Sequence, residues 1–338
     1  MRIIVLFGCT FILSVCLTGL LRRYAFKVSM LDIPNERSSH SVPTPRGGGL
    51  AAVFSFFLGL IVLWFLGVIS YRFILIFLPS GLLVAAVGWL DDHRALSARL
   101  RLLVHFVAAG LGLYCMGTLP SVPFFGSEIG PAFWSYVIFL PAVVWAVNLN
   151  NFMDGIDGIA AGESISVTLG AALILWMSGG DFAHVCLLIL LAVATAGFLF
   201  WNWPPAKIFM GDACSGFLGL SIGFFALITS VDGTMNLWSW IILYGVFLVD
   251  ATYTLGKRIV RGDKFYEAHR SHAYQILSRR LQSHKKVTSG VLIVNICWLF
   301  PIAIVTSLYP SYAFLGMIAA LTPLLVLAVK TGAGTTNQ

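Results

Sequence analysis

Five aspartates lie where long apolar runs begin or end, and they are the residues best suited to polar chemistry. They are Asp91, Asp92, Asp154, Asp157 and Asp212. Carboxylates within about 4–6 Å of one another resist ionising together unless a cation lies among them. Oxygen ligands favour a hard ion such as Mg²⁺, which also binds substrate phosphates. These acids therefore indicate a magnesium–pyrophosphate site, whereas the alternative is that each one caps a helix or forms a turn.

Asparagine and glycine residues accompany these acids at suggestive spacings. Asn148 and Asn151 are three residues apart, as are Asp154 and Asp157, so each pair would share one face of a helix. Gly211 precedes Asp212 at the start of an apolar run, where a carboxylate would lie beside the positive end of a helix dipole. These segments could bind a metal or a phosphate, or they could be capping motifs.

Cations and histidines near the acids are candidates for binding substrate anions. Lys207 could neutralise a phosphate as a point charge. Arg99 and Arg101 would diverge on a helix, so we expect only one of them to face the acids. His269, Arg270 and His272 form an HxxH pattern in a strongly basic loop, which is either an anion-binding loop or a solvated basic loop. His105 and His184, inside apolar runs, are interpreted as packing residues.

Membrane-spanning helices must hold these residues in place. The 338 residues are 59% hydrophobic and only 10% charged, with mean hydropathy +0.91, whereas a soluble domain has about 25% charged residues. Runs of about 20 apolar residues can cross a bilayer as helices. Such runs occupy 3–21, 47–69, 72–90, 100–119, 134–151, 160–178, 182–201, 213–231, 237–256, 289–308 and 311–330. We therefore predict an all-α fold, a polytopic transmembrane helix bundle with 11 spans.

The distribution of positive charge predicts the orientation of this bundle. Nineteen of the 21 Lys and Arg residues fall in loops on one side, and Arg2 and Arg72 fall on the other. Positive loops face the cytoplasm, so we expect the N-terminus outside and the C-terminus inside. The five aspartates, which the count does not use, then share the cytoplasmic side. We expect one integral-membrane domain, residues 1–338, whose cytoplasmic loops 22–46, 91–99, 152–159, 202–212 and 257–288 form the active face.

Several motifs occur together in an order that resembles the WecA/MraY superfamily of polyprenyl-phosphate N-acetylhexosamine-1-phosphate transferases. They are Asp91-Asp92, Asn151-Phe-Met-Asp154-Gly-Ile-Asp157-Gly, Phe209-Met-Gly-Asp212 and the histidine-containing last loop. The first loop contains Pro43-Thr-Pro-Arg46-Gly-Gly-Gly49 and is similar to the WecA- and WbpL-like, O-antigen-initiating branch. The resemblance runs from about residue 32 to residue 280.

The resemblance implies an activity and a location. The activity is transfer of a sugar 1-phosphate, of an N-acetylhexosamine or deoxy-N-acetylhexosamine, from a UDP-sugar to undecaprenyl phosphate with release of UMP. This would initiate O-antigen or other cell-envelope polysaccharide synthesis at the cytoplasmic face of a bacterial inner membrane. Mg²⁺, or Mn²⁺ in its place, is the expected cofactor. The expected partners are the two substrates and the lipid bilayer, with a homodimer allowed and no nucleic acid.

By matching positions, the resemblance also implies residue roles. Asp91 and Asp92 match the catalytic pair, while Asp212 and Asn151 match metal-binding positions. The candidates for substrate binding are Asn148, Asp154, Asp157, Arg99, Arg101, Lys207, Arg46, His269, Arg270 and His272. In this chain Arg-Ser separates the two loop histidines, and Cys214 stands where the family has Gly, which bears on the turn after Asp212.

Two other functions remain as alternatives. A cation-coupled transporter would use acids near the bilayer centre, and Asp250 inside the ninth apolar run is the candidate. Asp250 could equally be a structural partner to a neighbouring helix. A CDP-alcohol phosphotransferase would carry the string DGxxAR…GxxxDxxxD, which this chain lacks.

Overall fold

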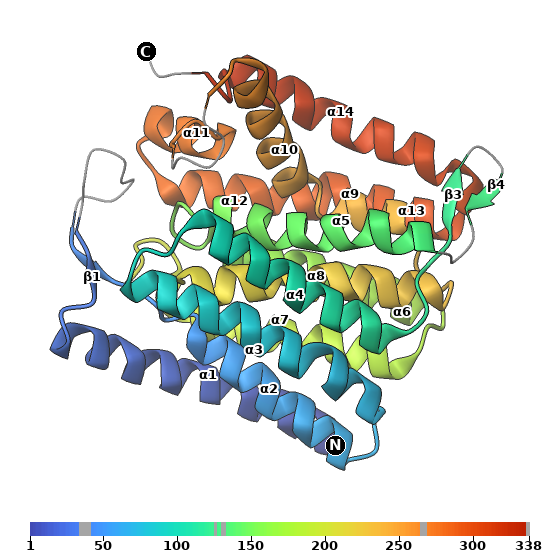
Figure 1. Ribbon diagram of the computed structural model, residues 1–338, viewed down its shortest axis with the longest axis horizontal. Helices are drawn as coiled ribbons and strands as arrows, with labels where there is room; N and C mark the ends of the chain where they lie inside the picture. The colour runs from blue at the N-terminus through green and yellow to red at the C-terminus, as the bar shows by residue number, and fades with distance from the viewer. Residues whose placement is uncertain (34–41, 125–126, 130–132, 264–268, 336–338) are drawn as a thin grey trace.

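The computed structural model describes residues 1–33, 42–124, 127–129, 133–263 and 269–335, and almost all of this is helix (Figure 1). The helices are α1 (Arg2–Lys27), α2 (Leu50–Phe65), α3 (Tyr71–His93), α4 (Ala98–Met116), α5 (Phe133–Phe152), α6 (Ile159–Met177), α7 (Phe182–Asn202), α8 (Asp212–Val231), α9 (Leu237–Leu243), α10 (Gly245–Val260), α11 (Ala273–Leu281), α12 (His284–Val294), η1 (Asn295–Leu299), α13 (Phe300–Leu308), η2 (Pro310–Tyr312) and α14 (Ala313–Thr331). Two short antiparallel hairpins are β1 (Leu31–Asp32) with β2 (Thr44–Pro45), and β3 (Val122–Phe124) with β4 (Ser127–Ile129). Parts of the predicted active-face loops, residues 34–41 and 264–268, lie outside the described residues.

The helices form one bundle in which α8 is central and α1 and α14 are peripheral (Figure 1). Of the apolar window of α8, 78% is buried, against 17% for α1 and 22% for α14. A cluster of phenylalanines from α2, α3 and α8 packs edge to face, with ring centroids 5.3–6.0 Å apart. Each such aromatic pair contributes about 0.5–1.5 kcal/mol beyond its buried area. The exposed apolar faces of the outer helices are those expected of helices that contact lipid.

The predicted polytopic helical bundle is confirmed, although two of the eleven apolar runs differ from single spans. Nine helices in the described part of the chain are long and apolar enough to cross a membrane, or ten if one bent pair counts as a span. Run 47–69 yields α2, which has 16 residues, fewer than the ~20 needed to span a bilayer. Run 237–256 yields α9 and α10, which meet at 81°. The count of 11 and the orientation of the termini stay predictions.

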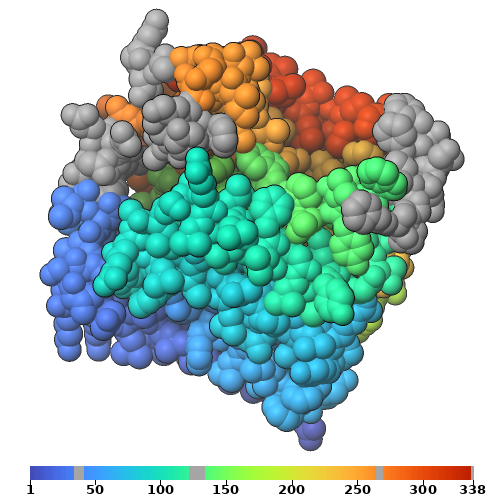
Figure 2. Space-filling model, viewed as in Figure 1, coloured from blue at the N-terminus to red at the C-terminus, as the bar shows by residue number. Residues whose placement is uncertain are grey.

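The two ends of the bundle differ. The hairpin β1–β2 and helix α11 lie at one end, and the hairpin β3–β4 lies at the other (Figure 1). Helices α3 and α4 cover the centre of the face in Figure 2. Helix α3 ends, and α4 and α8 begin, at the end that carries β1–β2. That end therefore receives the aspartates that the sequence singled out.

Candidate active site

Asp212 and the Asp91-Asp92 pair meet because α3 and α8 approach one another closely. A Cβ atom on Gly88 would collide with the backbone of Asp212 and Ala213, so only glycine allows this approach. One turn further along α3, the Asp92 carboxylate accepts the backbone N–H of Asp212, with N–O distances of 3.2 and 3.1 Å. The predicted convergence of these acids is therefore confirmed.

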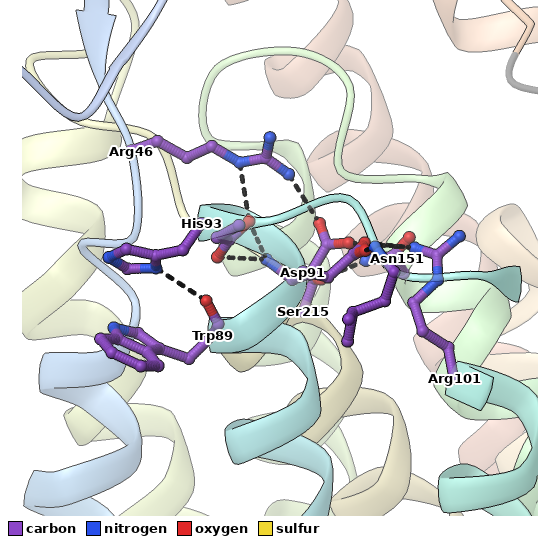
Figure 3. A network of polar contacts seen from close by, with 10 residues as sticks. Arg46, Trp89, Asp91, His93, Arg101, Asn151 and Ser215 are labelled. Atoms are coloured by element: carbon purple, nitrogen blue, oxygen red, sulfur yellow. Dashed lines mark hydrogen bonds and ion pairs between the residues drawn. The ribbon is translucent and has the colours of Figure 1, made fainter.

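Two arginines connect the three carboxylates (Figure 3). Arg46, between β2 and α2, places Nε 2.8 Å from Asp92 Oδ1 and Nη2 3.0 Å from Asp212 Oδ1. Arg101, in the first turn of α4, places Nη1 2.6 Å from Asp91 Oδ2 and 3.4 Å from Asp212 Oδ2. Burial lowers the pKa of Arg46, but the charges of Asp92 and Asp212 outweigh it and the net shift is upward. The cations that the acids require are therefore guanidinium groups in this structure.

The asparagines at the end of α5 bind the start of α8. Asn151 Nδ2 donates to Ser215 Oγ at 3.0 Å, and the buried Asn150 donates to the Ser215 carbonyl at 2.8 Å. Tyr244, at the junction of α9 and α10, donates its hydroxyl to Asn150 Oδ1 at 2.7 Å. Asn148 donates to the Val144 carbonyl of its own helix at 2.7 Å. Asn151 thus lies against the cluster, held by partners that sequence reasoning did not identify.

Asp154 and Asp157 have separate environments although they are three residues apart. Burial raises the pKa of Asp154 well above its usual value, and the charges of Asp212, Asp92 and Asp157 add to this effect. We call Asp91, Asp92, Asp212, Arg46 and Arg101 the acid–arginine cluster. The charges of this cluster act on Asp154, which therefore lies within its electrostatic influence. Asp157 instead accepts the Ala206 N–H at 3.0 Å and lies 3.0 Å from Nδ1 of His284. Asp157 fixes the loop between α5 and α6 to the start of α12.

Of the remaining predicted cations, Arg101 contacts the acids whereas Arg99 and Lys207 do not. Arg99 is exposed, which agrees with the expectation that only one of the two arginines faces the acids. The Lys207 ammonium lies 5.5 Å from the Trp201 ring, a cation–π contact at the surface. The prediction that Lys207 shares the acid site has no support among the described contacts.

The loop histidines form a second cluster beside the first. The Asp250 carboxylate accepts the N–H groups of Ala273 and Tyr274, both at 2.9 Å, and lies 3.2 Å from His272 Nδ1. It thereby caps the N-terminus of α11. Asp250 is thus the structural partner of a neighbouring helix, and this removes the main argument for a transporter.

We call residues 269–272 the histidine loop. The rings of His269 and His272 stack with centroids 4.9 Å apart. Burial lowers the pKa of His269 to about 3, with contributions from His272 and Arg258. His269 is therefore neutral at physiological pH. The Arg270 carbonyl accepts a hydrogen bond from Arg279 at 3.0 Å.

Tyr274 connects the two clusters. Its hydroxyl donates to the Phe152 carbonyl at the end of α5, at 3.0 Å. The chain therefore links the histidine loop directly to the segment that carries Asn151 and Asp154. No sequence pattern indicated this role of Tyr274, because its partner is a backbone group.

His105 and His184, interpreted as packing residues, are both buried, and the Nδ1 atom of each has no hydrogen-bond partner among the described residues. Glu163 in α6 is a second intramembrane acid besides Asp250 and is fully buried. A single acid inside an apolar run was the signal that could have found it. The turn at Cys214 is regular, since this residue lies in the first turn of α8 with its side chain against Gly49.

The acid–arginine cluster has the donor chemistry for a divalent cation. Among the described residues, no three Asp, Glu, His or Cys side chains are arranged as ligands of a metal ion. The guanidinium groups of Arg46 and Arg101 account for this, because they lie between the carboxylates. Four carboxylates, with Asp154 included, and two guanidinium groups carry a net charge of −2 when ionised. All the acid ligands are oxygens, as Mg²⁺ prefers.

Two cavities lie in the described part of the bundle. An apolar cavity of about 350 Å³ runs between α5, α8 and the α9–α10 pair and is lined near the site by Leu149 and Tyr244. A polar cavity of about 690 Å³ is lined by Asp157, Phe209, Arg279 and Lys285, among others. The protein thus has an apolar cavity inside the bundle and a cavity with charged lining residues at its end.

Comparison with known proteins agrees with this geometry. Residues 73–230 match the glycosyl transferase family 4. The chain is 30% identical over 310 residues to a probable undecaprenyl-phosphate N-acetylglucosaminyl 1-phosphate transferase of Bacillus subtilis, covering 89% of this chain and 84% of that protein. It is 29% identical over 282 residues to the phospho-N-acetylmuramoyl-pentapeptide-transferase of Chlamydia trachomatis, covering 75% and 80%. It is 32% identical over 226 residues to a decaprenyl-phosphate N-acetylglucosaminephosphotransferase of Mycobacterium tuberculosis, covering 61% and 55%. The chain therefore belongs to glycosyl transferase family 4, with MraY- and WecA-like polyprenyl-phosphate hexosamine-1-phosphate transferases as its homologues.

Proposed function

We propose that this protein transfers the 1-phosphate of an N-acetylhexosamine, or of a deoxy-N-acetylhexosamine, from a UDP-sugar to undecaprenyl phosphate and releases UMP. It would act at the cytoplasmic face of a bacterial inner membrane, as the first step of O-antigen or related envelope polysaccharide synthesis. The observation that carries the proposal is the meeting of Asp91, Asp92 and Asp212 with two arginines at one end of an apolar bundle. Two relatives support it, since their names describe an undecaprenyl-phosphate N-acetylglucosaminyl 1-phosphate transferase and a decaprenyl-phosphate N-acetylglucosaminephosphotransferase.

The two cavities suit two substrates of opposite character. The apolar cavity reaches Leu149 and Tyr244 beside the asparagines of α5, so a prenyl chain there would keep its phosphate near the acids. The polar cavity offers Arg279 and Lys285 for a diphosphate and the Phe209 ring for a base. Phe209 donates its backbone N–H to the Pro45 carbonyl at 2.8 Å, beside Arg46, so a nucleotide in this cavity could extend its diphosphate toward the acid–arginine cluster.

The exposure of the carboxylates separates their proposed roles. The Asp92 side chain is 0% exposed and its oxygens hold Arg46 and the Asp212 N–H. The side chains of Asp91 and Asp212 are 12% and 19% exposed. We therefore assign substrate contact to Asp91 and Asp212, and the positioning of α8 to Asp92.

The chain's own residues would then bind and orient the reacting phosphates. Arg46 and Arg101 would exchange carboxylate partners for phosphate oxygens and offset the charge that develops on them. Asp91 would hold the lipid phosphate deprotonated, so that its oxygen can attack the sugar-linked phosphorus while UMP leaves. Mg²⁺, or Mn²⁺, held by Asp212 and Asn151, would supply charge stabilisation at the diphosphate.

The test is a reconstituted reaction. Purified protein, undecaprenyl phosphate and a panel of UDP-sugars are incubated with and without Mg²⁺, and mass spectrometry identifies the lipid product while UMP is quantified. We expect a lipid-linked sugar diphosphate only with the metal, and its loss in Asp212→Asn. Full activity of the Asp212→Asn variant would refute the proposed site. A lipid-linked product formed without release of UMP would also refute it. Solute flux in proteoliposomes without a UDP-sugar would favour a transporter instead.

A further inference from the structure

Trp201, in the last turn of α7, packs against the second half of α1, which ends beside β1 (Figure 1). Its indole N–H donates to the Val15 carbonyl of α1 at 3.0 Å. A Cβ atom on Gly19 would lie 3.1 Å from the indole, so the ring lies directly against the backbone of α1. These contacts fix the ring in one place on the bundle.

Two cations lie over this ring. The Arg22 guanidinium carbon is 5.8 Å from the ring centroid and the Lys207 ammonium is 5.5 Å from it, both within the range of a cation–π contact. The Lys207 N–H donates to the Trp201 carbonyl at 2.8 Å, and Arg22 Nε donates to the Lys207 carbonyl at 3.2 Å. The fold therefore holds the two positive groups beside the same ring.

No acid balances the charge of this pair in the part of the chain that the structure describes. There, the side-chain hydrogen bond of Arg22 uses Nε alone, and the Lys207 ammonium contacts the Trp201 ring. The two Nη groups of Arg22 and the Lys207 ammonium therefore keep their N–H donors for an anion. A guanidinium group binds phosphate through two parallel hydrogen bonds, and an ammonium group binds it as a point charge.

The surroundings of the pair are those of a residue group at the edge of a bilayer. Arg22 lies near the end of α1, and Lys207 follows the end of α7. Apolar side chains on the same two helices are exposed, with Leu20 at 57%, Phe26 at 49% and Phe200 at 60%. Exposed apolar groups on spanning helices contact acyl chains, whereas Trp, Arg and Lys favour the membrane–water interface. The cations therefore lie where hydrocarbon gives way to headgroups.

We propose that Arg22, Lys207 and the Trp201 ring bind the phosphate of an anionic phospholipid headgroup, whose acyl chains lie against the exposed side chains of α1 and α7. A zwitterionic headgroup fits less well, because it would bring a third positive charge beside the two cations. Soluble phosphate would leave the adjoining apolar surface without a partner. The inference does not depend on the proposed function, and it gives Lys207 a membrane lipid as partner in place of a substrate phosphate.

The experiment is native mass spectrometry of the full chain in detergent micelles, in which bound lipids are counted as phosphatidylglycerol is added. The test variant combines Arg22→Gln with Lys207→Gln. The matched control combines Arg23→Gln with Lys27→Gln, which removes the same charge from exposed positions at the same end of α1. Phosphatidylcholine, glycerol 3-phosphate and undecaprenyl phosphate are the comparison ligands.

We expect the test variant to bind the first phosphatidylglycerol molecule about 30-fold more weakly, which corresponds to ~2 kcal/mol for two basic groups at an anionic headgroup. The control variant should bind it as the wild type does. Wild-type protein should prefer phosphatidylglycerol to phosphatidylcholine, and glycerol 3-phosphate should not displace the lipid.

Four results would overturn the proposal. Equal weakening in the two double variants would reduce the effect to overall positive charge, and equal affinity for phosphatidylcholine would remove the selectivity for an anionic headgroup. Displacement by glycerol 3-phosphate would show that a soluble phosphate suffices. Preferential displacement by undecaprenyl phosphate would assign these residues to the lipid substrate.

Two safeguards separate the possible failures. If the test variant does not fold, Arg22→Lys replaces it, because lysine keeps the charge but lacks the planar fork. The proposal then requires Arg22→Lys to weaken phosphatidylglycerol binding more than Arg23→Lys does. If the binding results agree but the wild-type chain transfers no sugar phosphate, the proposed function fails and the lipid site stands.

Discussion

At the scale of single residues, the candidate site consists of carboxylates paired with guanidinium groups. The carboxylates differ in how far they are buried, and this difference separates their proposed roles. Asp92 is completely enclosed and uses both oxygens on groups of the protein itself. Asp91 accepts the Leu96 N–H at 2.7 Å and Arg101 at its other oxygen, and it remains partly accessible. Two adjacent carboxylates therefore have different tasks, although their sequence positions alone make them equivalent.

This difference predicts different outcomes for matched substitutions. Asp91→Asn should abolish transfer. It should change the free energy of unfolding little, because the Arg101 side chain is 32% exposed to solvent and keeps its ion pair with Asp212. Asp92→Asn should lower that free energy by about 2 kcal/mol, since a hydrogen-bonded charged partner of Arg46 is lost. Thermal unfolding in detergent measures stability, and the lipid-product assay measures transfer. Arg99→Gln, at an exposed position, is the control. Equal destabilisation by the two aspartate variants would contradict the assignment.

At the scale of elements, glycine at the α3–α8 contact brings the acids together. Alanine in place of glycine inside a helix normally stabilises it by about 0.5–1 kcal/mol. Gly88→Ala should do the opposite, because the added methyl group would push α3 away from the start of α8 and move Asp92 off the Asp212 N–H. Gly256→Ala in α10 is the control, since a Cβ there meets no atom within 4 Å.

Unfolding temperature and transfer rate measured together check this prediction. We expect Gly88→Ala to lower both and Gly256→Ala to keep the rate while leaving the unfolding temperature equal or higher. A stabilised and fully active Gly88→Ala protein would show that the close approach of α3 and α8 does not position the site.

The elements also show what sequence reasoning can and cannot reach. Apolar runs and the polar residues at their ends are local signals, and so the helices and the meeting of Asp91, Asp92 and Asp212 could be predicted. The 81° bend after α9 could not be predicted, because run 237–256 contains no proline and its one charged residue, Asp250, lies well past the break. Likewise, Asn150, Tyr274 and Glu163 act through backbone groups or through residues that are distant along the chain. The role predicted for Lys207 stays a prediction, since its described contact is with the Trp201 ring rather than with the acids.

At the scale of the whole molecule, the two ends of the bundle differ in chemistry. The predicted active-face loops carry most of the positive charge, all five singled-out aspartates and the polar cavity. A nucleotide sugar made in the cytosol and a lipid phosphate held in the bilayer could meet only at a site that opens to both. The polar cavity beside Asp157 lies at the end with the acids, and the apolar cavity extends along α5 from the second half of α8 as far as Leu149 and Tyr244.

The orientation of this end can be tested along a single helix, α4, which has exposed residues at both termini. Arg99→Cys lies at the end with the acids, and Thr118→Cys follows the opposite end of the helix. In a background where Cys9, Cys16, Cys115 and Cys297 are replaced, a membrane-impermeant maleimide is added to intact spheroplasts and to lysed ones. Cys186 and Cys214 are buried and can remain. We expect Thr118→Cys to react in both samples and Arg99→Cys only after lysis, because the basic loops should face the cytoplasm. The reverse pattern would place the acids on the side that a cytosolic nucleotide sugar does not reach, and would thereby remove the basis for the proposed reaction.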